Sequence, residues 1–249
     1  SHSVGMDIIE EQRRFRDSTP SRLGRGLERL THPFGAAIAS VVPKGLVETV
    51  LKGLDRAAGA PRLVQFDHDA ADLEAARQAA RKVSRTARSV SATTGAAAGL
   101  GGALSMSADI PATIAIALRA IRDTGRAYGY TGDGPAEKLF RLQILELAAV
   151  DEPEARRDRI AALEAALGPA GELVHADHEH IAPIVDQAVE RISRAIAFTS
   201  FRSRAGMVVP LVGSIVGGLV NSSFQEDVGK AARFAFQARR LKGDASAAA

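Results

Sequence analysis

Two long stretches of this sequence contain no charged residue, and they constrain the fold more than any other feature. Residues 89–108 are rich in Ala, Gly, Ser and Thr, whereas residues 205–225 are rich in Val, Leu and Gly. Each stretch has about the length that a helix needs to cross a bilayer, which is roughly 20 residues. Both stretches must therefore be buried in the protein, placed against a membrane or covered by another copy of the chain.

The spacing of small residues within these stretches favours close helix packing. Gly95 and Gly99 are four residues apart, as are Gly213 and Gly217, so each pair lies on one helix face where a second backbone can approach. The first stretch has few large apolar side chains, and the second is interrupted by Pro210. Three interpretations remain open: a buried helix pair, a hairpin that rests on or dips into a membrane, and a pair of bilayer-spanning helices.

The remainder of the chain shows the periodicity of amphipathic helices. Of its 249 residues, 46% are hydrophobic and 24% are charged, which is sufficient for a sizeable core. Helices are expected over 44–58, 72–88 and 110–127, after residues 135, 153 and 183, and over 226–242. We predict an all-α, multi-helix bundle with two central glycine-containing apolar helical segments. The expected organisation is a polar N-terminal arm (1–39), a helical domain (40–242) and a disordered tail (243–249).

Composition excludes several classes of function. The chain has no cysteine, which rules out a disulfide scaffold, a thiol nucleophile and cysteine-ligated zinc. A net charge of +3 and an aromatic content of 4% argue against a nucleic-acid partner. The charged N-terminus lacks the apolar core of a signal peptide. We therefore predict a cytoplasmic protein, and no motif calls for a cofactor.

Two blocks of sequence resemble the signatures of the EcsC family. The first block contains Ser107-Ala108-Asp109-Ile110-Pro111, Leu118-Arg119, Tyr128-Gly129-Tyr130 and Leu142-Gln143-Ile144-Leu145; the second runs from Val209-Pro210-Leu211-Val212-Gly213 through Asn221 to Asp227-Val228-Gly229. Together they cover roughly residues 40–242. The resemblance implies a bacterial protein with a cytoplasmic or membrane-peripheral role. Because that family is named for a gene beside the genes of an ABC transporter, it also implies a link to such a transporter.

Asp109 is the one carboxylate in a region of some thirty otherwise uncharged positions. An unpaired buried charge is costly, so this side chain must cap a helix, pair with a cation or become protonated. Capping would use Asp109 at the N-cap with Pro111 in the first turn. Pairing would use Arg119 or Arg122. A carboxyl with a raised pKa would make Asp109 a candidate catalytic acid or base.

Several other polar residues lie in or near the signature blocks. Arg119 and Arg122 are one helical turn apart and either clamp a phosphate or carboxylate or form structural ion pairs. Tyr128 and Tyr130 are the only tyrosines of the chain, and buried tyrosines usually pack with satisfied hydroxyls. The candidate ligand-binding residues are Asp109, Arg119, Arg122, Tyr128, Tyr130 and Asn221.

Two further groups outside the blocks invite a functional interpretation. A basic stripe is formed by four arginines at helical spacing: Arg77, Arg81, Arg85 and Arg88. This stripe is either a solvated helix face or a surface that meets anionic lipid. His175 and His178 are weak candidate metal ligands, because their spacing specifies no third ligand. The alternative for the two histidines is an ordinary surface loop.

We expect a noncatalytic helical module that binds an apolar ligand, a membrane surface or a membrane protein. The first alternative is a hydrolase-type enzyme that uses Asp109 with a nearby Arg or Tyr. The second alternative is a structural homo-oligomer that associates through the small-residue faces. The partners to test are thus lipid, a membrane protein and a second copy of the chain.

Overall fold

The computed structural model describes residues 2–18, 44–99, 106–150, 153–176, 179–205 and 213–249, with residues 2–6, 94–99, 106–111, 195–205 and 213–223 described by their backbone alone. This part of the chain forms eight helices and no strand, which confirms the prediction of an all-α bundle. The helices are α1 (His2–Asp17), α3 (Lys44–Gly59), α4 (Leu73–Gly99), α5 (Met106–Ala127), α6 (Pro135–Ala149), α7 (Pro153–Ala165), α8 (Ala182–Ala205) and α9 (Gly213–Ala248).

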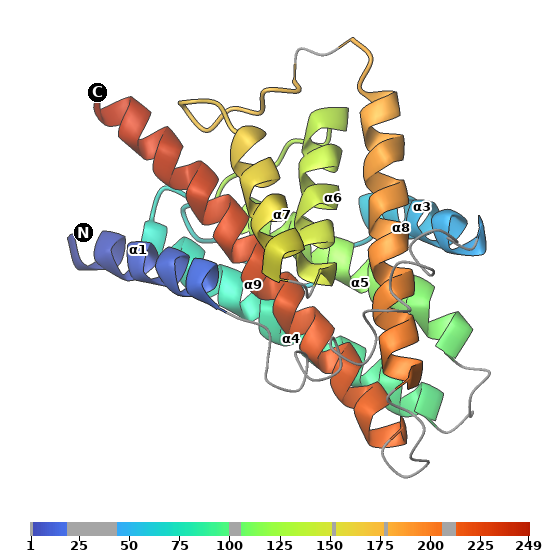
Figure 1. Cartoon of the computed structure of the whole chain (residues 1–249). Coiled ribbons are helices and arrows are strands. Elements are labelled where there is room, and N and C mark those ends of the chain that lie inside the picture. The colour runs from blue at the N-terminus through green and yellow to red at the C-terminus, as the bar shows by residue number, and fades with distance from the viewer. Residues whose placement is uncertain (1, 19–43, 100–105, 151–152, 177–178, 206–212) are drawn as a thin grey trace.

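Helix α9 organises the bundle. It runs diagonally across the molecule (Figure 1) and packs against α1, α4, α5, α6 and α8. Helix α3 lies across α5 and α8, and α7 packs against α6. Phe236 of α9 is 1% exposed and contacts the rings of Phe140 on α6 and Tyr130 after α5. The centre of the core therefore lies where α5, α6 and α9 meet.

Helix α6 is buried on nearly every side. Its buried apolar residues include Leu139, Leu142 and Leu145, as the wide apolar face in the sequence predicts. It also buries two charged residues, Arg141 and Glu146. Glu146 lies 2.9 Å from both Arg159 of α7 and Arg191 of α8, so this carboxylate ties three helices together.

Each uncharged stretch contributes described residues to two consecutive helices. The first spans the end of α4 and the start of α5, and the second begins at the end of α8 and continues into α9. The last turns of α4 and α8 and the first turns of α5 and α9 lie toward the lower right of Figure 1. Within the described residues, every helix is too short or too polar to cross a membrane.

Both ends of the described chain are more ordered than the sequence suggested. Residues 2–17 form α1, which packs on α9 and buries Ile8 completely, where we expected a loose polar arm. At the other end, α9 continues to Ala248, where we expected a disordered tail. The exposed extension is rich in alanine, a strong helix former, and Asp244 pairs with Arg240 at i, i+4.

Candidate functional site

Arg122 of α5 is buried against the end of α3 and is only 2% exposed. Its guanidinium donates hydrogen bonds to the carbonyl oxygens of Ala57, Ala60 and Pro61, at 2.5 to 3.0 Å. These carbonyls belong to the last turn of α3 and the residues after it, where a helix leaves acceptors without partners and where its dipole favours a cation. Arg122 therefore caps α3 from a neighbouring helix.

Asp123, the next residue, is fully buried and was not singled out from the sequence. Its carboxylate accepts hydrogen bonds from the Leu63 amide at 2.7 Å and from Arg122 at 3.0 Å. Arg126 lies 3.5 Å from the same carboxylate, and burial and the charge of Arg122 lower the pKa of Arg126. Together these side chains hold the segment between α3 and α4 in place.

Arg119 makes the third contact with this segment. It is half-buried, and its guanidinium donates to the Pro61 carbonyl at 2.9 and 3.3 Å. Arg119 and Arg122 thus share one carbonyl group as acceptor. The structure gives both arginines backbone acceptors, so a clamp on a phosphate or carboxylate ligand would have to displace these hydrogen bonds.

Tyr128 connects the end of α5 to α9 and α1. It is 1% exposed, and its hydroxyl accepts a hydrogen bond from Gln237 at 2.9 Å. Gln237 in turn accepts from Gln12 of α1 at 3.0 Å, and Gln12 also donates to the Phe234 carbonyl. This buried chain of polar groups supports the expectation that the tyrosine packs with its hydroxyl satisfied.

Burial raises the pKa of Tyr128 to about 12, although the Gln237 hydrogen bond opposes this effect. The ordinary value in an unfolded chain is about 10. Because the folded pKa is the higher one, the contribution of Tyr128 to stability is complete below pH 10 and is lost as pH rises toward 12. We expect near-ultraviolet absorbance to show tyrosinate at lower pH in urea-unfolded protein than in folded protein. The pH difference between folded and unfolded protein should shrink in Tyr128→Phe. Tyrosinate formation at the same pH in both states of the wild type would contradict the prediction.

Tyr130 lies beside a second buried arginine. The Arg239 guanidinium is 4.0 Å from the centre of the Tyr130 ring. Arg239 also forms a two-point ion pair with Glu137 at 2.8 and 2.9 Å and donates to the Gly171 carbonyl at 3.0 Å. Burial raises the pKa of Tyr130. Arg239 thus joins α9, α6 and the segment after α7, and Tyr130 packs as part of this junction.

Three of the four arginines of the predicted basic stripe of α4 lie near acidic residues of two different helices. Arg77 and Arg81 approach Glu11 of α1, and Arg88 lies 4.0 Å from Glu226 of α9. Arg85 is exposed. The stripe therefore faces α1 and α9 over most of its length, and sequence reasoning missed Glu11 because it assigned residues 1–39 to an arm.

The other sequence candidates are placed less fully. Asp109 lies in α5, three residues after its first residue, rather than directly before the helix as the capping role requires. Asn221 lies within α9. Only the backbone of these two residues is described. His175 is half-buried, His178 lies outside the described residues, and no group of three possible metal ligands occurs within them.

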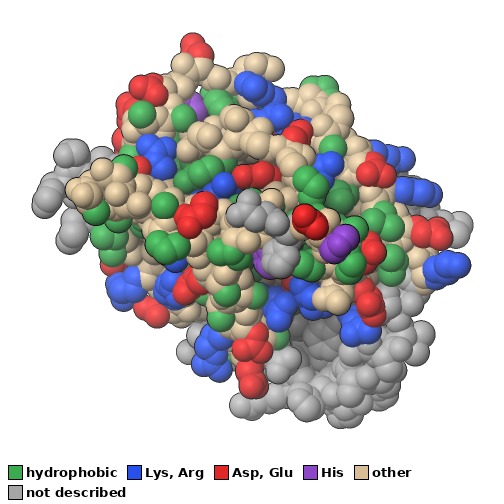
Figure 2. Space-filling view, turned by 90° about the horizontal axis from the view of Figure 1, so that it is seen from above, with side chains coloured by type: hydrophobic (Ala, Val, Ile, Leu, Met, Phe, Trp, Pro, Cys, Tyr) green, Lys and Arg blue, Asp and Glu red, His purple; other side chains and the backbone are tan. Residues whose placement is uncertain are grey.

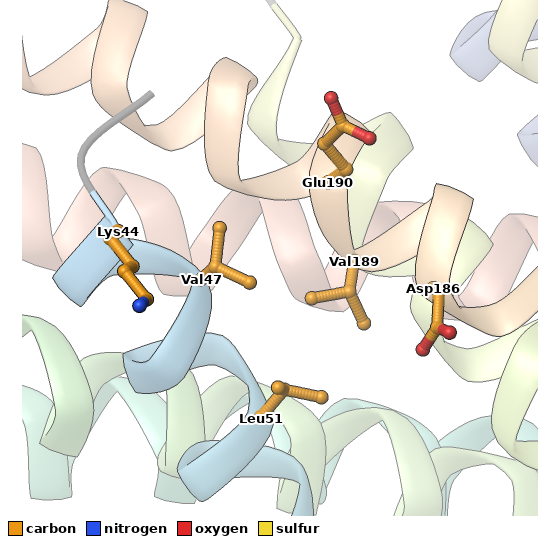
Figure 3. Close-up of a pocket in the computed structure, with 6 residues that line it drawn as sticks. All are labelled: Lys44, Val47, Leu51, Asp186, Val189 and Glu190. Carbon is orange, nitrogen blue, oxygen red and sulfur yellow. The ribbon is translucent and has the colours of Figure 1, made fainter. Parts of the chain in front are cut away.

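A shallow groove of about 430 Å³ lies between α3 and α8. In Figure 3 the side chains of Val47, Leu51 and Val189 project toward the space between the helices. Three charged residues complete the lining: Lys44, Asp186 and Glu190. None of the sequence candidates lines this groove, and its apolar floor of three side chains is small for an apolar ligand.

Comparison with known proteins agrees with the resemblance seen in the sequence. The model of the EcsC protein family matches residues 7–241, which includes most of α1. The chain is 24% identical over 147 residues to the uncharacterized protein YdbA of Bacillus subtilis (strain 168), and this alignment covers 57% of the chain and 49% of YdbA. The chain thus spans about half the length of this relative, and no solved structure matches it. Because the family model matches nearly the whole chain, the protein belongs to the EcsC family.

Proposed function

We propose that this protein is a noncatalytic helical module that binds an anionic membrane surface through the end of the bundle at which α4 and α8 end and α5 and α9 begin. The observation that carries the proposal is the course of the backbone. It brings the last turns of α4 and α8 and the first turns of α5 and α9, which contain much of both uncharged stretches, to one end of the molecule (Figure 1). In the last turns of α4 and α8 and the first turns of α5 and α9, the charged residues are Asp109, Arg202 and Arg204, and all others are uncharged. The uncharged residues can enter the interfacial region of a membrane without the cost of carrying a charge into it.

A basic residue directly precedes each uncharged stretch, and these two cations support an anionic membrane, whereas Asp109 follows the first stretch and Glu226 follows the second. Arg88 directly precedes the first stretch, and Arg204 directly precedes the second. A basic residue beside a membrane is attracted to anionic lipid by about 1 kcal/mol. The face of the molecule seen from above in Figure 2 carries interspersed basic and acidic side chains.

The contacts of Arg119 and Arg122 favour a binding module over the hydrolase alternative. Both guanidiniums donate to carbonyls at the end of α3, so they already have a structural role. A link to an ABC transporter is compatible with this module, because a membrane-bound protein is concentrated on the surface that contains the transporter.

The test is flotation of the purified protein with vesicles of phosphatidylcholine alone or mixed with phosphatidylserine. We expect binding to the mixed vesicles, and Arg204→Gln should weaken it about fivefold, which corresponds to the loss of about 1 kcal/mol. Ile215→Glu places a charge in the uncharged stretch and should abolish binding, because a carboxylate in a membrane is costly.

Two matched controls separate the membrane contact from general effects of charge. Lys242→Gln removes a cation near the opposite end of α9, and Leu51→Glu adds a carboxylate at an exposed position of α3. Both variants should float like the wild type. Circular dichroism establishes that each variant is folded. A wild-type protein that floats with neither vesicle, or a Leu51→Glu variant that fails as Ile215→Glu does, would overturn the proposal.

A further inference from the structure

Helix α1 is attached to the bundle by one apolar side and one polar side. Ile8 is fully buried, and Phe15 stacks on Phe234 of α9 with ring centres 4.4 Å apart. On the polar side, Gln12 donates to Gln237, and Glu11 points toward arginines of α4 and α9. Removing α1 would therefore uncover an apolar ring and several arginines together.

Glu11 is surrounded by three guanidiniums and accepts a hydrogen bond from Arg77, whereas the other two guanidiniums lie farther away. Its carboxylate oxygens lie 3.2 Å from Arg77, 3.4 Å from Arg233 and 4.0 Å from Arg81. Charge-assisted hydrogen bonds are normally about 2.7–2.9 Å long. Elsewhere in this structure Glu137 contacts Arg239 at 2.8 and 2.9 Å. One carboxylate is thus too small to meet all three cations at once.

The positive charge of Arg233 is incompletely paired with acceptors. Its side chain is 15% exposed, and its buried Nε lies 3.4 Å from a carboxylate oxygen of Glu11 without a well-aligned hydrogen bond. Burial lowers the pKa of Arg233, and the charge of Glu11 opposes this effect. A buried donor without an acceptor is unfavourable. An anion with more oxygen atoms and more charge would satisfy this position better than Glu11 does.

Arg77, Arg81 and Arg233, together with the carboxylates near them, form a charged cluster. The net charge of this cluster depends on whether α1 is docked. Arg77, Arg81 and Arg233 face Glu11, and Arg77 is also near Asp7 at 3.9 Å and Glu74 at 3.6 Å. Three positive charges therefore meet three negative ones. Two of those carboxylates belong to α1. Without α1 the cluster would retain three arginines and Glu74, which gives a net charge of +2.

The packing beside the cluster keeps the arginine side chain in place. At Gly229 of α9, a Cβ atom would overlap the buried hydroxyl of Ser84 on α4 and would lie 3.2 Å from a terminal nitrogen of Arg233. The absence of a side chain thus allows α4 and α9 to approach closely next to the guanidinium. Gly229 belongs to the second block that resembles the family signature, so this approach gives that motif a physical role.

From this geometry we propose that Arg77, Arg81 and Arg233 form a binding site for a phosphate group, which Glu11 occupies in this structure as an internal competitor. Phosphate suits the site because it brings up to two charges and can accept hydrogen bonds from several guanidiniums. The phosphate can belong to a free ion or to a lipid headgroup. Binding requires α1 to release Glu11, so ligand and docked α1 exclude each other. The inference does not rest on the proposed membrane-binding end of the bundle.

The experiment compares the full-length wild type with Glu11→Gln, using inorganic phosphate in calorimetry and chloride at equal ionic strength as the reference. Glu11→Gln removes the competing charge and should bind phosphate at least roughly tenfold more tightly, because a larger fraction of molecules is then competent to bind. Hydrogen exchange of the α1 amides should accelerate when phosphate is added. Both changes should disappear in the double variant Glu11→Gln, Arg81→Gln.

The matched control is Glu10→Gln. Glu10 is exposed and pairs with Arg13 and Arg14 within α1, so this variant makes the same charge change away from the cluster and should behave like the wild type. Vesicles that contain phosphatidic acid provide the second source of phosphate. If Glu11→Gln binds inorganic phosphate or the vesicles more tightly than the wild type, and if this gain requires Arg81, the result supports the site. The probe that shows the gain indicates whether the site takes a free phosphate ion or a lipid headgroup.

Three results would overturn the site. These are unchanged binding of Glu11→Gln to both sources, an equal gain in Glu10→Gln, and a gain that persists without Arg81. Arg81 is 45% exposed, so its replacement by Gln should leave the fold intact, and thermal unfolding verifies this. If the wild-type protein floats with neither kind of vesicle, calorimetry with inorganic phosphate still tests this site separately.

Discussion

Replacing Arg122 by Met should lower the free energy of unfolding by about 3 to 5 kcal/mol, the range for removing one partner of a buried ionic interaction. Methionine fills similar space but donates no hydrogen bond. The carbonyls of Ala57, Ala60 and Pro61 would lose this donor, and Asp123 would lose one of its cations. Urea unfolding followed by far-ultraviolet circular dichroism measures the loss.

The control for this variant is Arg119→Met. Arg119 contacts the same segment but is half-buried and bonds only to Pro61 among the described contacts. Its replacement should cost about 1 kcal/mol or less, the net value of an ordinary hydrogen bond. Equal losses in the two variants would show that the carbonyls at the end of α3 do not depend on Arg122.

Gly171→Ala should also destabilise the fold strongly, by about 2 to 4 kcal/mol. Gly171 has a φ angle of +76°, which side chains other than glycine rarely adopt. An added Cβ would overlap the carbonyl oxygen of Arg239 and would lie 3.2 Å from the amide nitrogen of Gly243. Because these neighbours are backbone atoms of α9, they cannot rotate away as a side chain would.

Gly134→Ala is the matched control for Gly171→Ala. Gly134 has a φ angle of −68°, and no atom lies within 4 Å of a Cβ built there. Because Gly134 is the N-cap of α6 and alanine is a poorer N-cap than glycine, this variant should lower the free energy of unfolding by no more than about 1 kcal/mol. A wild-type midpoint for Gly171→Ala would show that the segment after α7 shifts to accommodate the methyl group.

The helices were predictable wherever the chain carries clear start and stop signals. Pro135 begins α6, and the proline at 153 begins α7, as expected for proline in a first helical turn. The expected start of α3 also agrees with the structure. By contrast, the start of α9 lies thirteen residues before the predicted 226, because glycines at 213, 217 and 218 weaken the local signal without preventing a helix.

The candidate site was predictable as a list of polar residues, but the partners of those residues were not. Arg119 and Arg122 are one turn apart, which indicates a shared direction. Their spacing cannot show that the end of α3, about 60 positions earlier, supplies the acceptors. The role of a buried arginine depends on which backbone carbonyls tertiary packing brings to it, and helical periodicity carries no such information.

One signal for α1 was present in the sequence. Ile8, Gln12 and Phe15 recur at spacings of four and three, which is the pattern of one helix face. The many charges around them obscured it, because α1 carries both acidic and basic residues on its exposed side. Recognising this face would have predicted a docked helix, although not its contact with Arg233.

The pairing of α1 with α9 has a consequence for synthesis of the chain. Gln12 meets the Phe234 carbonyl and Gln237 across separations of 222 and 225 residues. At roughly 5–20 residues per second, α1 leaves the ribosome on the order of ten seconds or more before these partners are made. During that interval Ile8 and Phe15 lack their native surface. Docking of α1 is therefore a late event in folding, and the nascent chain offers an amphipathic helix that a chaperone can hold until translation ends.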